Sequence, residues 1–159
     1  MTTLKAGQQG VLIVLSRYYE EIAAELLKGA TVALEEAGMG YDIMDAPGAL
    51  EIPQAIAMAI EAKRFTKWTA EGRYRGAIAL GCVIRGETTH YDIVAGESAR
   101  ALMDLSVRHC LPIGNGILTV ENEEQALERA SVDKLDKGGD AAKACIALIK
   151  LRDNLSRND

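Results

Sequence analysis

The stretch that decides the fold is "GAIALGCVIRGETTHYD", residues 76–92, in which an apolar run gives way to a short polar turn. Residues 76–84 are rich in aliphatic side chains, which is typical of a strand buried on both faces of a parallel sheet. Gly86 follows in the turn, and a helical pattern begins a few residues later. A strand, a turn and a helix in this order predict one unit of an α/β fold.

Three other apolar runs predict further strands. They are "GVLIVL" at residues 10–15, "IGNGILTV" at residues 113–120 and, more weakly, "YDIMDA" at residues 41–46. Each is short and is bounded by polar or turn-forming residues. Together with residues 76–84 they predict a sheet of four strands.

Five helical patterns separate and follow these runs. The first repeats apolar residues at Ile22, Leu26, Ala30 and Ala33 and stops at Gly38. The second holds Pro53 in its first turn and continues through Ile56 and Ile60. The third helix is expected from about Tyr91 to about His109. The fourth should begin after Asn122, which is a plausible N-cap. The fifth should begin at about Gly139 and bury Ala142, Cys145, Leu148 and Ile149.

The element order β-α-β-α-β-α-β-α-α predicts the fold class. We expect a doubly wound, flavodoxin-like three-layer α/β/α sandwich around a four-stranded parallel sheet with right-handed crossovers. The 159 residues fit one domain, which we place at residues 10–159 after a polar N-terminal arm at residues 1–9.

Composition excludes several classes of protein. The longest apolar runs are too short for a membrane span, and the start of the chain lacks a signal-peptide pattern, so we expect a cytoplasmic protein with no membrane partner. Cys82, Cys110 and Cys145 stand among apolar neighbours, which favours reduced, buried thiols.

The net charge of -5 opposes a nucleic-acid partner. The local exception is the segment of residues 63–75, where basic residues alternate with Phe65, Trp68 and Tyr74. We interpret it as a solvated helix end and surface loop, in preference to an RNA-binding patch.

In this fold class, ligands bind outside the carboxyl ends of the strands. That rule selects residues 16–19, 46–51 and 85–90, and the region of Asn115 if its strand ends or bends there. In the third of these segments, Gly86 permits a tight turn and Thr88 or Thr89 is a candidate helix cap, so the unpaired N–H groups favour an anion such as phosphate. An ordinary helix start has the same residues, so the motif alone leaves both interpretations open.

His90 stands at the edge of this turn and is suited to proton transfer near neutral pH, although a capping or surface histidine is an equal alternative. His109 is read as compensating the helix dipole at the far end. A metal site from His90, Asp92 and His109 fails, because 19 helical residues separate the two histidines by roughly 30 Å.

Other strand-end residues have both plain and functional interpretations. Glu51 in "PGALEIP" is suited to a polyol, yet glutamate is common in a first helical turn. Tyr18 or Tyr19 is suited to stacking on a planar heterocycle, or to ordinary packing. Arg129 and Lys137, taken one at a time, have no feature that distinguishes them from ordinary solvated side chains.

Five segments together resemble one family, the 6,7-dimethyl-8-ribityllumazine synthases of riboflavin synthesis. They are "SRYYEEIAAELLKGA", "PGALEIP", "GCVIRGETTHYDIV", "GNGILTVENEEQALERA" and "DKGGDAA", and they cover nearly the whole chain in the family's order. The resemblance implies condensation of 5-amino-6-(D-ribitylamino)uracil with 3,4-dihydroxy-2-butanone 4-phosphate, with no metal and no cofactor.

The resemblance also implies a role for each matched residue. His90 matches the proton-transfer histidine. The butanone phosphate would be held by Gly86, Glu87, Thr88, Arg129 and, less securely, Lys137. The pyrimidine and its ribityl chain would contact Tyr18, Ala49, Leu50, Glu51, Cys82, Val83, Ile84 and Asn115. Tyr19 and Asn115 depart from the family's usual Asn and Phe, which predicts a more polar pyrimidine pocket.

The family's active site lies between adjacent subunits of a ring of five. The resemblance therefore implies a homo-oligomer, with Arg129 reaching a neighbour's phosphate loop and the N-terminal arm adding to a neighbour's sheet. Among pentamers, paired pentamers and sixty-subunit cages, we favour the free pentamer.

Two other classes of function remain as alternatives. One is a lumazine- or flavin-binding carrier or shell protein without catalysis, against which His90, Arg129 and the phosphate loop argue. The other is a flavodoxin or receiver domain, but "SRYYEE" after the first strand supplies neither an acidic cluster nor a phosphate loop.

Overall fold

The computed structural model describes residues 4–66 and 71–157. The strands are β1 (Gly10–Ser16), β2 (Tyr41–Ala46), β3 (Tyr74–Ile84) and β4 (Ile113–Val120). The helices are α1 (Glu20–Glu36), α2 (Glu51–Glu61), α3 (His90–His109), α4 (Glu123–Ala130) and α5 (Lys137–Leu155). This is the predicted order of elements.

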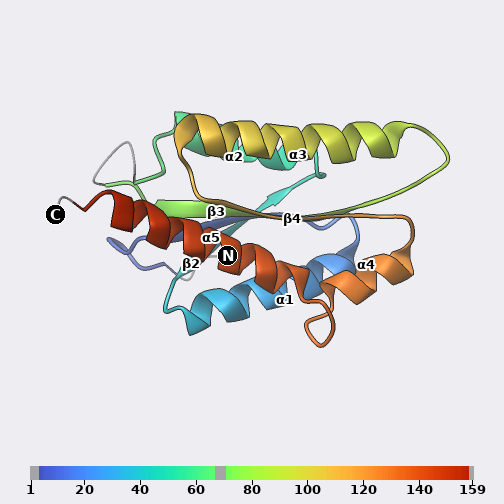
Figure 1. Ribbon diagram of the computed structural model, residues 1–159, viewed down its shortest axis with the longest axis horizontal. Coiled ribbons are helices and arrows are strands. Elements are labelled where there is room, and N and C mark those ends of the chain that lie inside the picture. The colour runs from blue at the N-terminus through green and yellow to red at the C-terminus, as the bar shows by residue number, and fades with distance from the viewer. Residues whose placement is uncertain (1–3, 67–70, 158–159) are drawn as a thin grey trace.

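All four strands lie parallel in one sheet, in the order β2-β1-β3-β4. Helices α2 and α3 cover one face, and α1, α4 and α5 cover the other (Figure 1). The predicted three-layer α/β fold is therefore confirmed. The chain moves outward from β1 to β2 and then crosses to β3, so the strand order reverses between β1 and β3, where ligands bind in such sheets.

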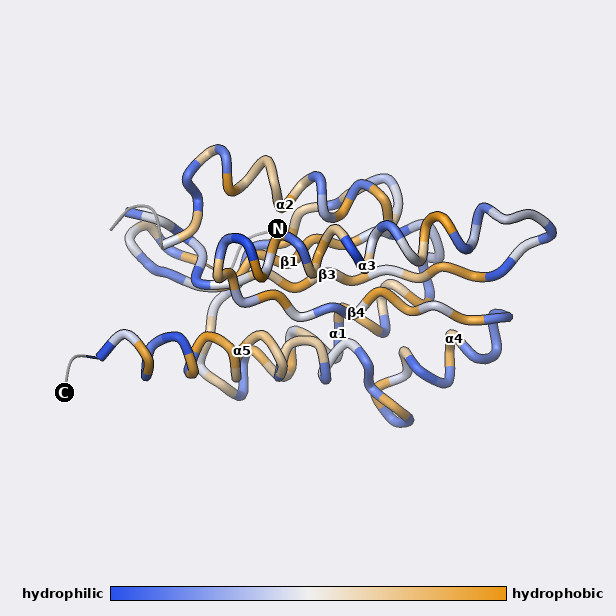
Figure 2. Tube along the Cα trace, turned by 45° about the horizontal axis from the view of Figure 1, so that its top comes forward, coloured by the Kyte–Doolittle hydropathy of each residue, from blue (hydrophilic) through white to orange (hydrophobic). Residues whose placement is uncertain are grey.

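The apolar runs become strands because the helical layers bury both faces of the sheet. Every residue of β1 is buried, and Figure 2 shows apolar colouring along much of the sheet. On α1, the predicted core residues Ile22, Leu26, Ala30 and Ala33 are all buried against the sheet. Gly38, with φ of +69°, follows the end of that helix as predicted.

Helix boundaries agree with the predictions to within about two residues. The Asn122 side chain caps α4 by accepting a hydrogen bond from the Gln125 N–H at 2.9 Å. Helix α5 begins at Lys137 rather than near Gly139, because the Asp136 side chain caps it by accepting from the Gly139 N–H at 3.1 Å. The prediction that Leu148 is buried is wrong, since α5 turns Ile146 and Ile149 to the core and leaves Leu148 exposed.

All three cysteines are free, and they differ in exposure. Cys145 is buried and Cys82 is half-buried. The predicted burial of Cys110 is wrong, because this residue leaves α3 in a left-handed conformation, φ 49°, that places it on the surface.

Within the described part of the N-terminal arm, Leu4 packs into the core of the chain, while residues 5–9 are exposed. Leu4 is buried, and its carbonyl accepts a hydrogen bond from Arg73 Nη2 at 3.1 Å. Arg73 Nε in turn lies 2.6 Å from Oδ2 of the buried Asp42, which also accepts from the Tyr74 hydroxyl at 2.8 Å. A buried charge cluster thus ties residue 4 to β2 and to the start of β3.

The segment of residues 63–75 is less solvated than predicted. Phe65 and Tyr74 are fully buried and pack edge to face, with ring centroids 5.8 Å apart. Trp68 lies outside the described residues. Because two of the three aromatic rings belong to the core, they do not offer the stacking surface that an RNA patch requires.

Among residues 4–66 and 71–157, no helix combines the length and the apolarity needed to cross a membrane.

Candidate active site

A pocket of about 330 Å³ opens where β1, β2 and β3 end, and we call it the strand-end pocket. The β1–α1 connection contributes Ser16, Tyr18 and Tyr19, and the β2–α2 turn contributes residues 48–51. The end of β3 and the start of α3 supply the remaining wall: Cys82, Val83, Ile84, Gly86, Thr88, His90, Tyr91 and Val94. Ten of the fourteen predicted site residues therefore lie together.

The histidine begins α3 and is exposed beside the pocket. Its backbone N–H donates to the Thr88 hydroxyl at 3.3 Å, whereas Thr89, the N-cap, makes no capping bond with its side chain. Among the described residues, the backbone N–H groups of residues 86–88 have no backbone partner. Free N–H groups at a helix start attract anions, so this loop, residues 85–89, is suited to bind a phosphate. We call it the phosphate loop.

Two tyrosines form the side of the pocket next to β1. The Tyr18 ring is 75% exposed and meets Tyr19 edge to face, with centroids 5.0 Å apart. Tyr19 is half-buried against the core. Burial is the main cause that raises its pKa, and the nearby Cys82 raises it further. Tyr18 thus keeps an open ring face that a planar heterocycle can cover.

The floor of the pocket is apolar. Val83 packs with Ala49 and Val94, and Leu50 and Tyr91 border the same cluster. Burial raises the pKa of the Cys82 thiol to about 12, with a smaller contribution from Glu123. This thiol stays protonated near neutral pH and is no nucleophile there.

Three predicted residues lie elsewhere. Asn115, Arg129 and Lys137 line a second pocket, of about 390 Å³, between β4 and α5, which we call the β4–α5 pocket. Arg129 is half-exposed and Lys137 pairs with Asp140 at 3.0 Å. The strand does not end at Asn115 but runs on to Val120, so the condition on which the strand-end rule would select this region is not met. Glu87, the fourteenth residue, is exposed on the phosphate loop outside the pocket lining.

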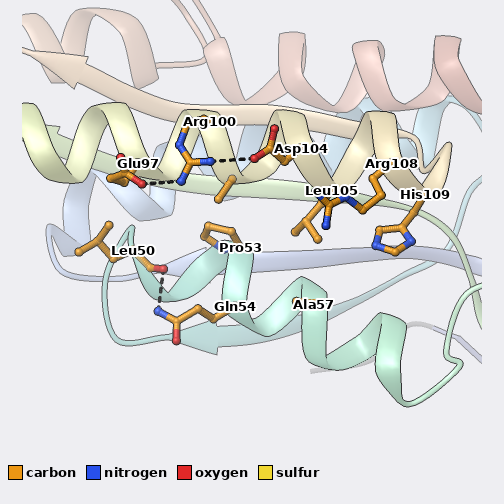
Figure 3. A pocket seen from close by; sticks show the side chains of 11 residues that line it. Leu50, Pro53, Gln54, Ala57, Glu97, Arg100, Asp104, Leu105, Arg108 and His109 are labelled. Atoms are coloured by element: carbon orange, nitrogen blue, oxygen red, sulfur yellow. Dashed lines mark hydrogen bonds and ion pairs between the residues drawn. The ribbon is translucent and has the colours of Figure 1, made fainter.

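A groove of about 390 Å³ between α2 and α3 adjoins the strand-end pocket at Leu50. Figure 3 shows Arg100 on α3 between Glu97 and Asp104, with ion-pair distances of 2.7 and 2.8 Å. His109 lines the far end of this groove, a whole helix away from His90. In the described part of the chain, no three or more His, Cys, Asp or Glu side chains gather to hold a metal ion.

Sequence reasoning missed several residues of the site. Tyr91 and Val94 line the strand-end pocket and lie outside every selected segment. Ser16, which lines the same pocket, and Arg85, which ties its loop to the end of β4, lie in selected segments but were given no role. The signal for Val94 was present, because a residue four positions after His90 lies on the same face of a helix, whereas Tyr91, one position after it, carried no such signal.

The comparisons with known proteins give the family. A model of the 6,7-dimethyl-8-ribityllumazine synthase family matches residues 8–153. The chain belongs to this family.

Individual lumazine synthases agree over most of their length. The Methylorubrum populi enzyme is 61% identical over 142 residues, which cover 89% of this chain and 82% of the relative. The Afipia carboxidovorans enzyme is 55% identical over 92% of this chain and 88% of its own length. The Agrobacterium fabrum enzyme is 56% identical over 91% of this chain and 95% of its own. The predicted family and enzyme class are confirmed.

Proposed function

We propose that this chain condenses 5-amino-6-(D-ribitylamino)uracil, the pyrimidine substrate, with 3,4-dihydroxy-2-butanone 4-phosphate, the butanone phosphate. The products are 6,7-dimethyl-8-ribityllumazine, inorganic phosphate and water. One observation carries the proposal: His90, a loop with free N–H groups and a pocket with an open aromatic ring meet at one place in a chain of this family.

The pyrimidine substrate would occupy the strand-end pocket. Tyr18 would cover one face of its ring, and the ends of β3 at Cys82, Val83 and Ile84 would border its edge. Ala49, Leu50 and Glu51 would receive the ribityl chain, because Glu51 offers a carboxylate to its hydroxyls. The N–H groups of Ala49 and Leu50, which have no backbone partner among the described residues, would donate to the same chain. The apolar floor supports this assignment, since it excludes water from the ring.

The butanone phosphate would lie over the β3–α3 loop. Gly86, Glu87 and Thr88 would supply backbone N–H groups to the phosphate. Arg129 and Lys137 would add positive charge from the β4–α5 pocket of another copy of the chain, because within one subunit they line a separate surface. Asn115 would reach the pyrimidine from that same copy.

Catalysis would depend mainly on bringing two substrates together. The amine of the pyrimidine substrate condenses with the ketone of the butanone phosphate, which releases water. Phosphate then leaves, and the ribitylamino nitrogen attacks the remaining carbonyl, which closes the ring of the lumazine and releases a second water. His90 would move protons between these groups, and we expect the chain to need no metal or cofactor.

A shared site requires an assembly of subunits. An interface that joins two different surfaces is heterologous and forms a ring when its rotation closes, and the family resemblance indicates a ring of five subunits. Exposed apolar residues on α3 support self-association: Ile93, Met103 and Val107 are 53%, 64% and 70% exposed. We favour a free pentamer, and a sixty-subunit mass in light scattering would contradict that choice.

The proposal also covers where the enzyme acts in the cell and what the N-terminal arm contacts. Three free thiols fit a reducing compartment, so we infer that the enzyme acts in the cytoplasm. We place one domain at residues 10–159. The buried Leu4 favours an arm that stays on its own subunit over one that adds to a neighbour's sheet.

The direct test is a turnover assay with both substrates and no added metal or cofactor. We expect fluorescent lumazine and stoichiometric phosphate. Tight binding of lumazine without its formation would instead support a carrier or shell protein.

A further inference from the structure

The loop between β3 and α3, residues 85–89, lies in solvent along its whole length, and so does His90 at the start of α3. Apolar burial therefore does not hold it in place. Its backbone is tied at the start by the Arg85 N–H, which donates to the Val120 carbonyl at 3.0 Å, and at the end by the Thr88–His90 hydrogen bond. Between these two hydrogen bonds, side-chain contacts must hold the conformation of the loop.

The Arg85 side chain makes three contacts from one guanidinium. Its Nε donates to Glu121 Oε2 at 2.8 Å, just beyond β4. Its Nη1 lies 3.5 Å from Asp92 Oδ1 in the first turn of α3. The guanidinium carbon also stands 4.2 Å from the centre of the Tyr91 ring, which lines the strand-end pocket.

We propose that Arg85 is a positioning residue that fixes the phosphate loop and His90 relative to the end of β4. The proposal rests on the proposed function of that loop. A single exposed ion pair contributes little to stability. Here, however, one planar guanidinium makes all three contacts, and they join the β3–α3 connection to the β4–α4 connection. Figure 1 shows both connections, β3–α3 and β4–α4, at the same end of the sheet.

Arg85 does not itself bind the phosphate in this account. Its guanidinium is engaged by two carboxylates and a ring, and those carboxylates repel a phosphate dianion. The contacts also require an arginine. A lysine ammonium keeps the charge but lacks the planar fork that reaches two carboxylates while stacking on a ring.

Steady-state kinetics of Arg85→Lys, Arg85→Gln, Glu121→Gln and the double variant Arg85→Gln/Glu121→Gln test the proposal. Both Arg85 variants should raise KM for the butanone phosphate and lower kcat, so that kcat/KM falls by roughly 10- to 100-fold. The KM of the pyrimidine substrate should change less than about twofold. Glu121→Gln should act in the same direction, and the double variant should be no worse than Arg85→Gln.

The matched control is Arg75→Gln. Arg75 lies at the other end of β3, ten residues or roughly 33 Å from Arg85, and forms an ion pair with Asp153. We expect its kinetics to match the wild type. Wild-type kinetics in Arg85→Lys would show that charge alone matters, and additive losses in the double variant would show independent roles. Equal losses in Arg75→Gln would indicate a general loss of stability. Each of these results would overturn the proposal.

A second measurement does not depend on activity. Amide hydrogen exchange of His90, Asp92 and Ile93, whose N–H groups donate to Thr88 or Thr89 at the end of the loop, should be faster in both Arg85 variants and in Glu121→Gln than in the wild type or Arg75→Gln. Unchanged exchange would reject the positioning role even if turnover fell. A wild-type protein that forms no lumazine would reject the proposed function, while the exchange result would still decide on Arg85.

Discussion

His90 and Arg129 line two different pockets of the same chain. His90 borders the strand-end pocket with the phosphate loop, and Arg129 borders the β4–α5 pocket with Asn115 and Lys137. Both residues match motifs of one active site, so their separation is the main structural argument for a site built from two copies of the chain.

The two histidines should behave differently when replaced. His90→Ala should lower kcat by roughly 10- to 10⁴-fold, the usual contribution of acid/base catalysis, while the protein still assembles. His109→Ala, at the other end of α3, is the matched control and should keep wild-type turnover. Equal rates in the two variants, measured by lumazine fluorescence, would remove His90 from the mechanism.

Arg129 should matter for one substrate only. In Arg129→Ala we expect the KM of the butanone phosphate to rise by about tenfold or more, because a charged hydrogen bond to phosphate is lost. The KM of the pyrimidine substrate should stay within about twofold. A larger effect on the pyrimidine substrate would contradict the phosphate role.

Two aspartates of β2 provide a matched test of stability. Asp42 is 7% exposed and binds Arg73 and Tyr74, whereas Asp45 pairs with Arg17 in solvent. Asp42→Asn should lower the free energy of unfolding by about 3 kcal/mol, because the half-buried Arg73 loses the charge of the carboxylate it pairs with. Asp45→Asn should cost less than about 1 kcal/mol. Similar urea midpoints for both variants would show that the cluster is not the anchor described above.

Buried thiols should make the protein less stable at high pH. Burial raises the pKa of Cys145 to about 12 from an ordinary 9.0. Its contribution to stability is therefore complete below pH 9 and is lost as the pH rises from 9 to 12, since only the unfolded thiol ionises readily. Between pH 8 and 10, wild type should lose about 1.4 kcal/mol more than Cys145→Ala. Cys110→Ala, which removes an exposed thiol, should keep the wild-type slope, and a wild-type slope in Cys145→Ala would refute the argument.

The sequence predicted most of the fold because its signals are local. The apolar runs at residues 10–15 and 76–84, the Asn122 cap and Gly38 each determine structure within a few residues. The errors have tertiary causes. Phe65 and Tyr74 are buried by contacts with the N-terminal segment and with each other, and the exposure of Leu148 depends on how α5 turns over the sheet.

The candidate site was predictable where the parallel sheet forces strand ends together. Tyr18, Glu51, Cys82 and His90 come from different connections, and the topology alone places them in one pocket. The role of Arg85 was not predictable, because its partner Glu121 is 36 residues away and no local pattern joins the two. The placement of Arg129 in a second pocket also required the packing of α4 and α5.

Co-expression of His90→Ala and Arg129→Ala subunits tests the central claim, a lumazine-forming site shared between two copies, most directly. Each variant alone should be nearly inactive at low butanone phosphate. In mixed rings, about one quarter of the sites would pair an intact His90 with an intact Arg129 of the neighbour, so activity should recover to about that fraction of wild type. If each subunit supplies its own complete site, no site in the mixture is intact, and activity no higher than that of the separate variants would contradict the account.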